Sequence, residues 1–412
     1  MFFKLALESL LDRKGSFFLS FIAMTVSIFV LLSVEHIRNQ TKESFSSALS
    51  GVDLIVGAKT GDINLLLYTV FRIGRPTSNV SWQSFEVFKN NPNVNWAIPI
   101  SLGDSHKGFP VLGTNKDYFK YYSYGEKRKL VFKKGKKFLR LFDVVLGSEV
   151  AQRLNYQIGD KLVIAHGLSE VSFMVHDGMP FKIVGILEST GTPVDRTLHV
   201  KLEAMEAIHG GSKIKLENLE EPQHEKFIQA EHLYPKNITS FMVGLKSKIT
   251  TFQLQRDINN YAKEPLLAVL PGVALSELWR IMSVVESSLF LISVLIFISA
   301  SLGVSAILLS SIRERTKEIK LLRVVGAPSF FIFCLLELEA SIVTVASIIS
   351  ASCMLIFSSY FFQRFLVNEL GLNLGKVILS ELNIMIFIFI LLTTMFLTLI
   401  PSIYAFVLSR NY

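Results

Sequence analysis

The stretch SSIRERTKEIKLLRVVGA, residues 310–327, lies between two of the longest apolar runs of the chain. It carries five Lys or Arg and two Glu between Arg313 and Arg323. Apolar positions recur through it at helical spacing, at Ile312, Ile319, Leu322 and Val325. This spacing predicts a helix with one apolar stripe among charged side chains, and Gly326 is placed to end that helix. We expect a short helix between two membrane spans, with a stripe suited to docking.

The rest of the chain is too apolar for an ordinary soluble protein. Of its 412 residues 50% are hydrophobic, and the mean hydropathy is +0.43. The excess is concentrated in four runs, 17–34, 289–309, 330–360 and 384–407. Each is long enough to cross a bilayer at about 20 residues per span. The region between the first two runs has a globular composition. The expected fold is therefore an α-helical membrane protein with four transmembrane helices and a large α+β extracytoplasmic domain inserted between helices 1 and 2.

Basic residues beside the spans set the expected orientation, because Lys and Arg flanks stay in the cytoplasm. The N-terminal flank of the first span, the 311–329 loop and the C-terminus together hold nine of them. The 361–383 loop holds only Arg364 and Lys376. Both termini and the 311–329 loop are therefore expected on the cytoplasmic side of the membrane, and the large domain and the 361–383 loop on the outer side. The net charge of +8 reflects this topology, so we do not interpret it as nucleic-acid binding.

These arguments divide the chain into eight segments. The transmembrane helices are predicted at 17–36, 281–310, 330–360 and 384–408. The other segments are a cytoplasmic amphipathic helix at 1–16, the extracytoplasmic domain at 37–280, a cytoplasmic coupling helix at 311–329 and a short outer loop at 361–383. The first span is interpreted as an uncleaved anchor rather than a signal peptide, because no small-residue cleavage pattern follows it.

Alternating apolar patterns predict the elements of the external domain. Strands are expected at 51–59, 94–100, 171–176, 181–189, 240–246 and 266–270. Helices are expected at 81–90, 202–209 and 250–263. Residues 144–165 are expected to form a strand, a helix, a Gly-Asp turn and a second strand, and Asp177-Gly178 predicts a hairpin turn. The first and last strands lie next to the two spans, so the module is expected to be split in sequence. An amphipathic helix at 275–288 should run without a break into the second span.

Two polar segments of the external domain have alternative interpretations. Residues 118–140 combine tyrosines with eight Lys or Arg from Lys127 to Arg140, and predict either a solvated loop or a contact with anionic headgroups or an acidic partner. Residues 220–232 place His224 and His232 among glutamates, which favours a polar surface segment over a divalent metal site. Glu286, Glu337 and Glu339 lie near the ends of predicted spans, where we expect them to be interfacial.

Several catalytic patterns are absent from the sequence. It contains no G-x-x-x-x-G-K-[ST], so the chain cannot be an ATPase by that route. It contains no G-x-S-x-G or H-E-x-x-H, so no motif supports a hydrolase or a protease. We expect a non-catalytic membrane subunit.

Three stretches carry a family resemblance. RERTKEIKLLRVVGA (313–327), followed by FCLLELEA (333–340), resembles the loop after the second span of FtsX/MacB/LolC-type ABC transporter permeases. VVLGSEVAQRLNYQIGDKLVI (144–164) and FKIVGILESTGTPVDRTLHV (181–200) resemble their extracytoplasmic core domain, and LIPSIYAFVLSR (399–410) resembles the end of their fourth span. The order of one span, a large external domain and three further spans is that family's layout.

The resemblance implies a mechanotransmission mechanism. Two permease subunits, identical or different, would each dock their coupling helix on a cytoplasmic ABC ATPase dimer, which binds ATP and Mg while the permease itself holds no cofactor. The implied docking residues are Arg313, Arg315, Lys317, Glu318, Ile319, Leu322, Arg323 and Gly326. The implied substrate is a lipoprotein, lipid or peptide handled from the membrane or its outer side. The alternatives are a non-transporting FtsX-like regulator of a periplasmic protein partner and a zinc-linked transport component.

Overall fold

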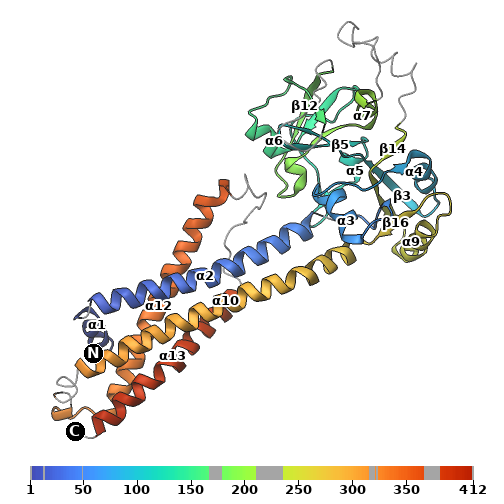
Figure 1. Cartoon of the computed structure of the whole chain (residues 1–412). Helices are drawn as coiled ribbons and strands as arrows, with labels where there is room; N and C mark the ends of the chain where they lie inside the picture. The colour runs from blue at the N-terminus through green and yellow to red at the C-terminus, as the bar shows by residue number, and fades with distance from the viewer. Residues whose placement is uncertain are drawn as a thin grey trace. The chain divides into compact units, whose positions relative to one another are not determined.

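The computed structural model describes residues 2–12, 14–48, 50–166, 179–209, 235–314, 321, 323–365 and 381–410 (Figure 1). The chain divides into two compact units. One unit consists of Met1–Thr41 and Met282–Tyr412, and the other is Lys42–Ile281. The boundaries between the two units fall inside two long helices.

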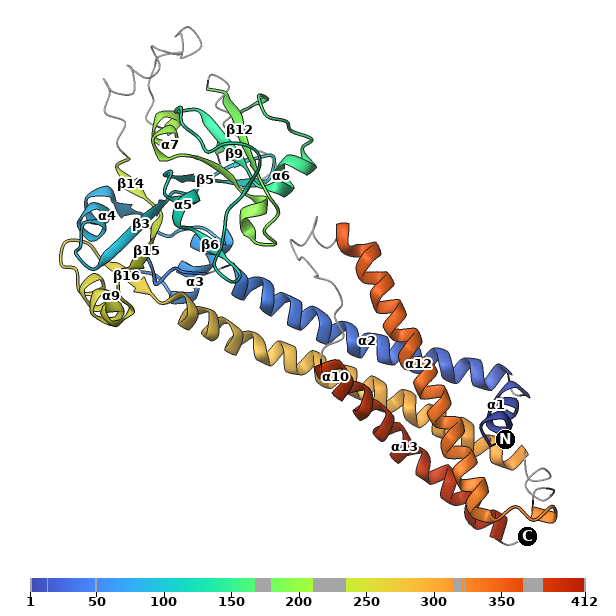
Figure 2. The same cartoon turned by 180° about the vertical axis from the view of Figure 1, so that it is seen from behind.

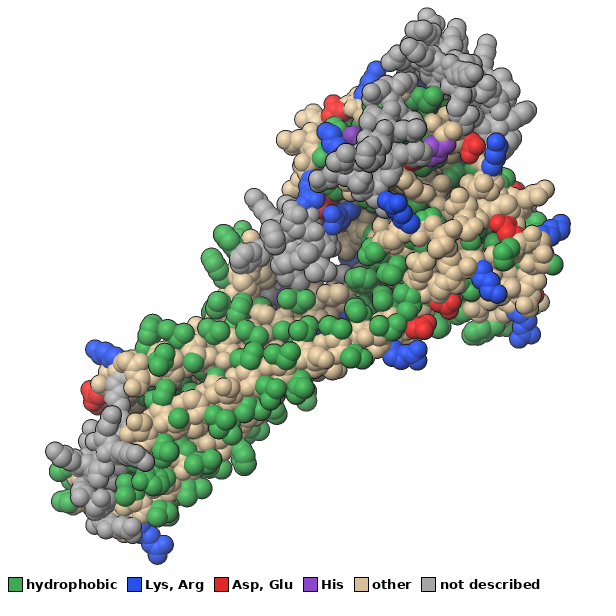
Figure 3. Space-filling model, in the orientation of Figure 1, with side chains coloured by type: hydrophobic (Ala, Val, Ile, Leu, Met, Phe, Trp, Pro, Cys, Tyr) green, Lys and Arg blue, Asp and Glu red, His purple; other side chains and the backbone are tan. Residues whose placement is uncertain are grey.

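Four helices of the described chain are long and apolar enough to cross a membrane, with spans at Lys14–Glu43, Pro271–Ser310, Ser329–Phe361 and Ile384–Arg410. They belong to α2 (Lys14–Ser47), α10 (Pro271–Glu314), α12 (Ser329–Phe365) and α13 (Glu381–Arg410). Hydrophobic side chains cover the outer surface of these helices (Figure 3). Such a surface is stable only against lipid or protein. The predicted fold, with four membrane-spanning helices and a domain inserted between the first two, is therefore confirmed.

The ends of the first two spans differ from the sequence expectation. α2 continues to Ser47 and α10 starts at Pro271, so both extend beyond positions 36 and 281. The polar sequence after residue 36 contains no Pro or Gly before Ser47, and a helix can therefore continue there with exposed polar side chains. The predicted unbroken helix from 275 into the second span is confirmed by α10. Where the bilayer begins and ends along these helices stays a prediction.

The predicted N-terminal helix is α1 (Phe2–Asp12). Ala6 and Leu10 are buried, whereas Phe3, Leu7 and Leu11 are exposed. An amphipathic helix with an outward apolar side is typical of a segment lying at a membrane surface.

The external unit begins with a four-stranded sheet of order β16-β1-β15-β3. Its strands are β1 (Leu54–Ala58), β3 (Val94–Ile100), β15 (Ser240–Leu245) and β16 (Leu266–Val269). One face packs against α4 (Trp82–Lys89) and α9 (Thr251–Asn259), which lie beside this sheet in both views (Figure 2). The other face packs against α3 (Asp62–Leu66) and the π-helical turn η1 (Leu67–Phe71). Burial on both faces explains why β1 is a continuous apolar run.

A second, mixed sheet has the order β10-β12-β9-β13-β5-β4-β11, with β8 paired to β12. Its strands are β4 (Asp104–His106), β5 (Phe109–Thr114), β8 (Phe132–Gly135), β9 (Asp143–Leu146), β10 (Lys161–Leu162), β11 (Ala165–His166), β12 (Phe181–Leu187) and β13 (Leu198–Lys201). The helices α6 (Ser148–Arg153) and α7 (Leu202–His209) and the turn η2 (Pro193–Arg196) pack on it. A bridge between Ser101 and Gly113 joins the two sheets. The short strands β2 (Val80–Ser81) and β14 (Asn237–Ile238) form a separate antiparallel pair.

Most predicted elements of this domain are confirmed. The helix at 202–209 and the strand at 94–100 have the predicted bounds. The split module is confirmed, because β1 pairs with both β15 and β16 from the end of the domain. The predicted helix at 250–263 is shorter, since α9 ends at Asn259 and a 3-10 turn, η4 (Lys248–Thr250), precedes it. The predicted strand at 171–176, the Asp177-Gly178 turn and the polar segment at 220–232 lie outside the described residues.

The 118–140 segment is a solvated loop only in part, so that interpretation was wrong for the residues in helix and strand. It forms α5 (Tyr118–Tyr121), β6 (Ser123–Tyr124) and β7 (Arg128–Lys129), and it ends after β8. Tyr118 and Tyr122 are buried, and the Tyr121 ring stacks on Trp96 with centroids 5.7 Å apart. These aromatic contacts hold the segment against the core, because each ring buries a large apolar area. All eight Lys and Arg side chains remain exposed.

Candidate functional site

The predicted coupling helix is described only at its two ends. Residues 315–320 and 322 lie outside the described residues, and most of the predicted docking residues are among them. The side chain of Arg313 also lies outside the described part of the chain. At the far end the Gly326 N–H donates to the Arg323 carbonyl at 3.0 Å, and Gly326 has a φ of +97°. A left-handed residue of this kind ends a helix, as the glycine predicts. Arg323 Nη1 donates to the Ala327 carbonyl at 3.0 Å, which holds its guanidinium over the turn.

Apolar side chains are exposed around this turn. Leu321 is 65% exposed, Val324 86% and Val325 87%. The stripe predicted from sequence included Val325 but missed Leu321 and Val324. It also included Ile312, which is fully buried, so Ile312 cannot belong to a docking surface. Ile312 and Val325 both fit the helical spacing of the predicted stripe. Only the packing of neighbouring helices makes Ile312 buried while Val325 is exposed.

Ile312 instead forms part of a small core at the end of the helix bundle. It packs with Ile332 and Leu336 from α12 and with Ala405 from α13. Leu309 and Leu408 extend this cluster. The cluster fixes the end of α10 against the start of α12, so both ends of the coupling segment leave from one packed core.

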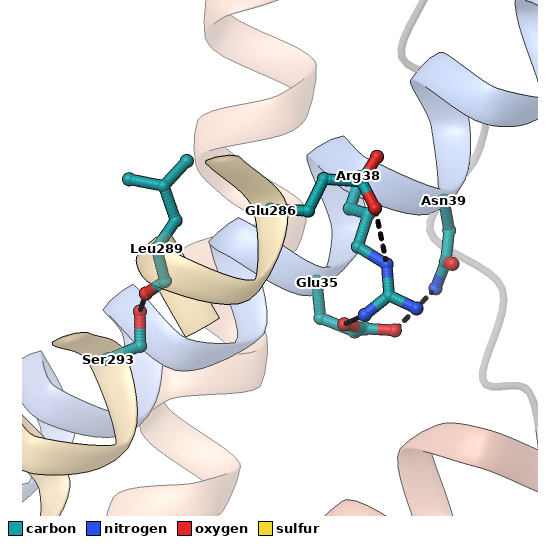
Figure 4. A network of polar contacts seen from close by, with 6 residues as sticks. All are labelled: Glu35, Arg38, Asn39, Glu286, Leu289 and Ser293. Atoms are coloured by element: carbon teal, nitrogen blue, oxygen red, sulfur yellow. Dashed lines mark hydrogen bonds and ion pairs between the residues drawn. The ribbon is translucent and has the colours of Figure 1, made fainter. Parts of the chain in front are cut away.

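A polar network around Arg38 joins α2 to α10 (Figure 4). Arg38 lies between two carboxylates. Its Nη1 is 3.1 Å from Glu35 Oε2 on its own helix, and its Nε is 3.5 Å from Glu286 Oε2 on α10. Asn39 Nδ2 also donates to Glu35 Oε1 at 3.0 Å. Sequence reasoning singled out Glu286 alone, although the i, i+3 spacing of Glu35 and Arg38 was a signal for the pair.

Glu337 and Glu339 are enclosed by helices, and their expected interfacial position in the membrane stays a prediction. Glu337 is 8% exposed and Glu339 is 2% exposed. Glu337 Oε2 accepts a hydrogen bond from Thr398 of α13 at 3.1 Å, and Glu339 Oε1 accepts one from Ser9 of α1 at 2.6 Å. Residues that are two positions apart in a helix point about 200° apart around its axis, and α12 therefore directs the two carboxyls to different neighbours. Which helices lie on those sides is a tertiary fact.

The metal interpretation finds no support in the described part of the chain. No group of three or more His, Cys, Asp or Glu is arranged there to hold a metal ion. His224 and His232 lie outside the described residues. The zinc hypothesis therefore stays a prediction from sequence.

Comparison with known proteins supplies the family. Residues 17–261 match the family model of the MacB-like periplasmic core domain, and residues 290–410 match that of the FtsX-like permease C-terminal region. The search of curated proteins finds no match.

Two solved structures are similar to parts of the chain. One is the extracellular domain of the noncanonic ABC-type transporter YknZ from Gram-positive bacteria, at 10% identity and a TM-score of 0.32, covering 52% of this chain and 98% of that one. The other is the periplasmic region of MacB from Actinobacillus actinomycetemcomitans, at 12% identity and a TM-score of 0.34, covering 55% of this chain and 94% of that one.

The two family matches follow one another along the sequence in the order of the observed fold. The first alone spans more than half of the 412 residues, and the second covers the three later membrane helices. The chain therefore belongs to the FtsX/MacB-type family of ABC transporter permeases.

Proposed function

We propose that this permease subunit converts ATP hydrolysis by a separate cytoplasmic ABC ATPase dimer into movement of its external domain. Permease subunits of this family are generally non-catalytic and work with an ABC ATPase partner. ATP and Mg would bind to that partner, and no cofactor would bind to this chain directly. The docking residues would be Arg313, Arg315, Lys317, Glu318, Ile319, Leu322, Arg323 and Gly326, joined by Leu321, Val324 and Val325 because they are exposed.

The continuity of α10 is the observation that carries this proposal. The helix starts two residues after β16 ends at Val269 and continues without interruption to Glu314, where the coupling segment begins. Its 44 residues correspond to about 66 Å at 1.5 Å per residue. A helix without a Pro or a break after its first residue transmits displacement better than a loop, because its hydrogen bonds resist bending.

The ion pair between Arg38 and Glu286 supports joint movement of α2 and α10. Both helices continue into residues of the external unit. A contact between them at this level would make a displacement of one helix shift the other.

We further propose that two permease subunits assemble in a bacterial inner membrane with the external domain outside and both termini inside. The substrate would be a lipoprotein, lipid or peptide handled at the outer side. Buried hydroxyls of the spans support this, because Ser305, Thr344 and Thr394 donate to carbonyls four residues earlier in their own helices. Hydroxyls satisfied in this way do not line a path for a hydrophilic solute.

The test uses the full chain reconstituted with its ATPase in lipid nanodiscs. Lys317→Glu, Arg323→Glu and Leu322→Glu are each expected to abolish permease-dependent stimulation of ATP hydrolysis while leaving insertion unchanged. Ile249→Glu is the matched control, because Ile249 is 91% exposed in the external domain and far from the coupling segment in sequence. Normal stimulation in all three coupling variants would refute the proposal.

A second candidate function is regulation of an extracytoplasmic protein without transport. The observation that favours it is the exposed basic surface of residues 127–140, of which Arg128, Lys129, Lys133 and Lys134 lie on the strands β7 and β8. A fixed array of Lys and Arg suits an acidic partner better than a flexible loop does, because less side-chain and backbone entropy is lost on binding. Capture of a stable acidic protein by the full chain in detergent, together with no transported molecule, would favour this function over the first.

A further inference from the structure

A cavity of about 250 Å³ lies in the external unit, between the turn after η1 and the β4–β5 hairpin. Two arginines, Arg72 and Arg75, contribute to its wall. The remaining wall is largely apolar, with Pro76, Leu102 and Pro110. A mostly apolar hollow with a few convergent polar groups is typical of a ligand site.

Arg72 makes no ion pair with any residue that the structure describes, and the same holds for Arg75. Arg72 Nη1 is buried and lacks a hydrogen-bond partner among the described residues. A guanidinium that is partly withdrawn from water without a counter-charge is costly. An anion in the cavity would remove that cost.

The groups on the inner side of Arg72 are neutral. Burial raises the pKa of Tyr118 to about 12, although the Arg72 charge opposes the shift. Burial and the same charge lower the pKa of His199 to about 3. Neither Tyr118 Oη nor His199 Nε2 has a hydrogen-bond partner among the described residues. Neither of these two groups therefore carries a charge that could neutralise Arg72.

One carboxylate, Asp104, also contributes to the cavity wall. It is fully buried and forms an ion pair with His209, with Nε2 3.2 Å from Oδ2. Two arginines stand against this one carboxylate in the cavity wall, so an excess of positive charge remains there.

The backbone at Arg72 is also unusual. It follows the π-helical turn η1 and has φ 60° and ψ 26°, the left-handed conformation that favours glycine. A non-glycine residue pays about 1 kcal/mol there, and π-helical turns are frequent at functional sites. Glycine fits this backbone conformation without strain, so a glycine substitution at Arg72 removes the guanidinium and leaves the turn undisturbed.

We propose that this cavity binds the phosphate group of an anionic ligand. Arginine forks match phosphate oxygens in two parallel hydrogen bonds, which a lysine or a neutral side chain does not reproduce. The apolar wall would contact carbon atoms attached to the phosphate. The source is either a phospholipid headgroup or free phosphate, and the site is independent of ATPase docking.

The test is calorimetric titration of the full chain in a non-ionic detergent and phosphate-free buffer. One probe is inorganic phosphate and the other is dihexanoyl phosphatidic acid. Arg72→Gly is expected to weaken binding about tenfold or more, since it removes a charge-assisted contact but suits the backbone. Lys127→Gly is the matched control, because Lys127 is exposed and has φ 58°, and it should leave binding unchanged.

The exposed Arg75 provides a second variant, Arg75→Gln, should Arg72→Gly fail to fold. Tighter binding of the lipid than of inorganic phosphate would assign the site to a headgroup, and equal binding would assign it to free phosphate. Absence of binding of both probes to the natural chain would overturn the proposal. Unchanged affinity in a folded Arg72→Gly or Arg75→Gln chain would also overturn it.

Discussion

Replacing Arg38 by Gln is the most informative perturbation of the membrane unit. Arg38 is the cation between Glu35 on its own helix and Glu286 on α10. The two carboxylates differ in exposure. The Glu35 side chain is 6% exposed and that of Glu286 is 27% exposed. Loss of Arg38 would therefore leave one buried charge and one charge that can reach solvent.

The difference in burial sets the expected magnitudes. Leaving a buried carboxylate without its partner costs about 3–5 kcal/mol. Asn39 still donates to Glu35, and Arg38 itself is 40% exposed, so we expect the low end, about 3 kcal/mol. Glu286→Gln removes only a half-exposed pair and should cost about 0.5 kcal/mol. Glu35→Gln in the Arg38→Gln chain should recover most of the loss, because no buried charge then remains.

The assay is reversible unfolding of the full chain in mixed micelles, titrated with a denaturing detergent and followed by helical circular dichroism. The four chains with and without the Glu35 and Arg38 substitutions form a double-mutant cycle. Equal destabilisation by Arg38→Gln and Glu286→Gln would refute the reasoning. So would a failure of Glu35→Gln to rescue the Arg38→Gln chain.

Three further predictions concern other sites. The hydrogen bond to Asp104 raises the pKa of His209 above its usual 6.5. The pair therefore stabilises the domain fully below pH 6.5, and this stabilisation is lost as the pH rises through the pKa of His209 in the folded chain. The stability of a His209→Gln chain should lack this dependence, measured by denaturant titration from about pH 5 to 8. Gly147→Ala should destabilise the domain by about 3 kcal/mol in the same assay, because its β-carbon would overlap backbone carbonyls of the η2 turn. Glu337→Ala should loosen the α12–α13 contact more than Glu337→Gln, measured by proteolysis in detergent, because Gln keeps an acceptor for Thr398.

Each of these has a control or a contrary result. A stability difference between the natural chain and His209→Gln that does not vary with pH would contradict the role of the pair. Gly61→Ala is the control for Gly147, because a β-carbon there meets nothing within 4 Å, and equal effects of the two would exclude the steric argument. Equal proteolysis of the two Glu337 variants would show that the hydrogen bond contributes nothing.

The elements with strong local patterns could be predicted closely from sequence. The helix at 202–209 and the strand at 94–100 match because each pattern is bounded by breakers or by a change of period. The segment at 118–140 could not be predicted, because charged side chains dominate its composition while a few aromatic rings decide its packing.

Sequence alone determined the four spans, the inserted domain, the family and the helix end at Gly326, because hydrophobic length, alternation and glycine conformation are local properties. Tertiary structure decided which apolar side chains beside the coupling segment are exposed, where the carboxyls of Glu337 and Glu339 are directed, and that Arg38 joins two helices. These facts depend on which helices become neighbours, and residues far apart in the chain settle that by packing.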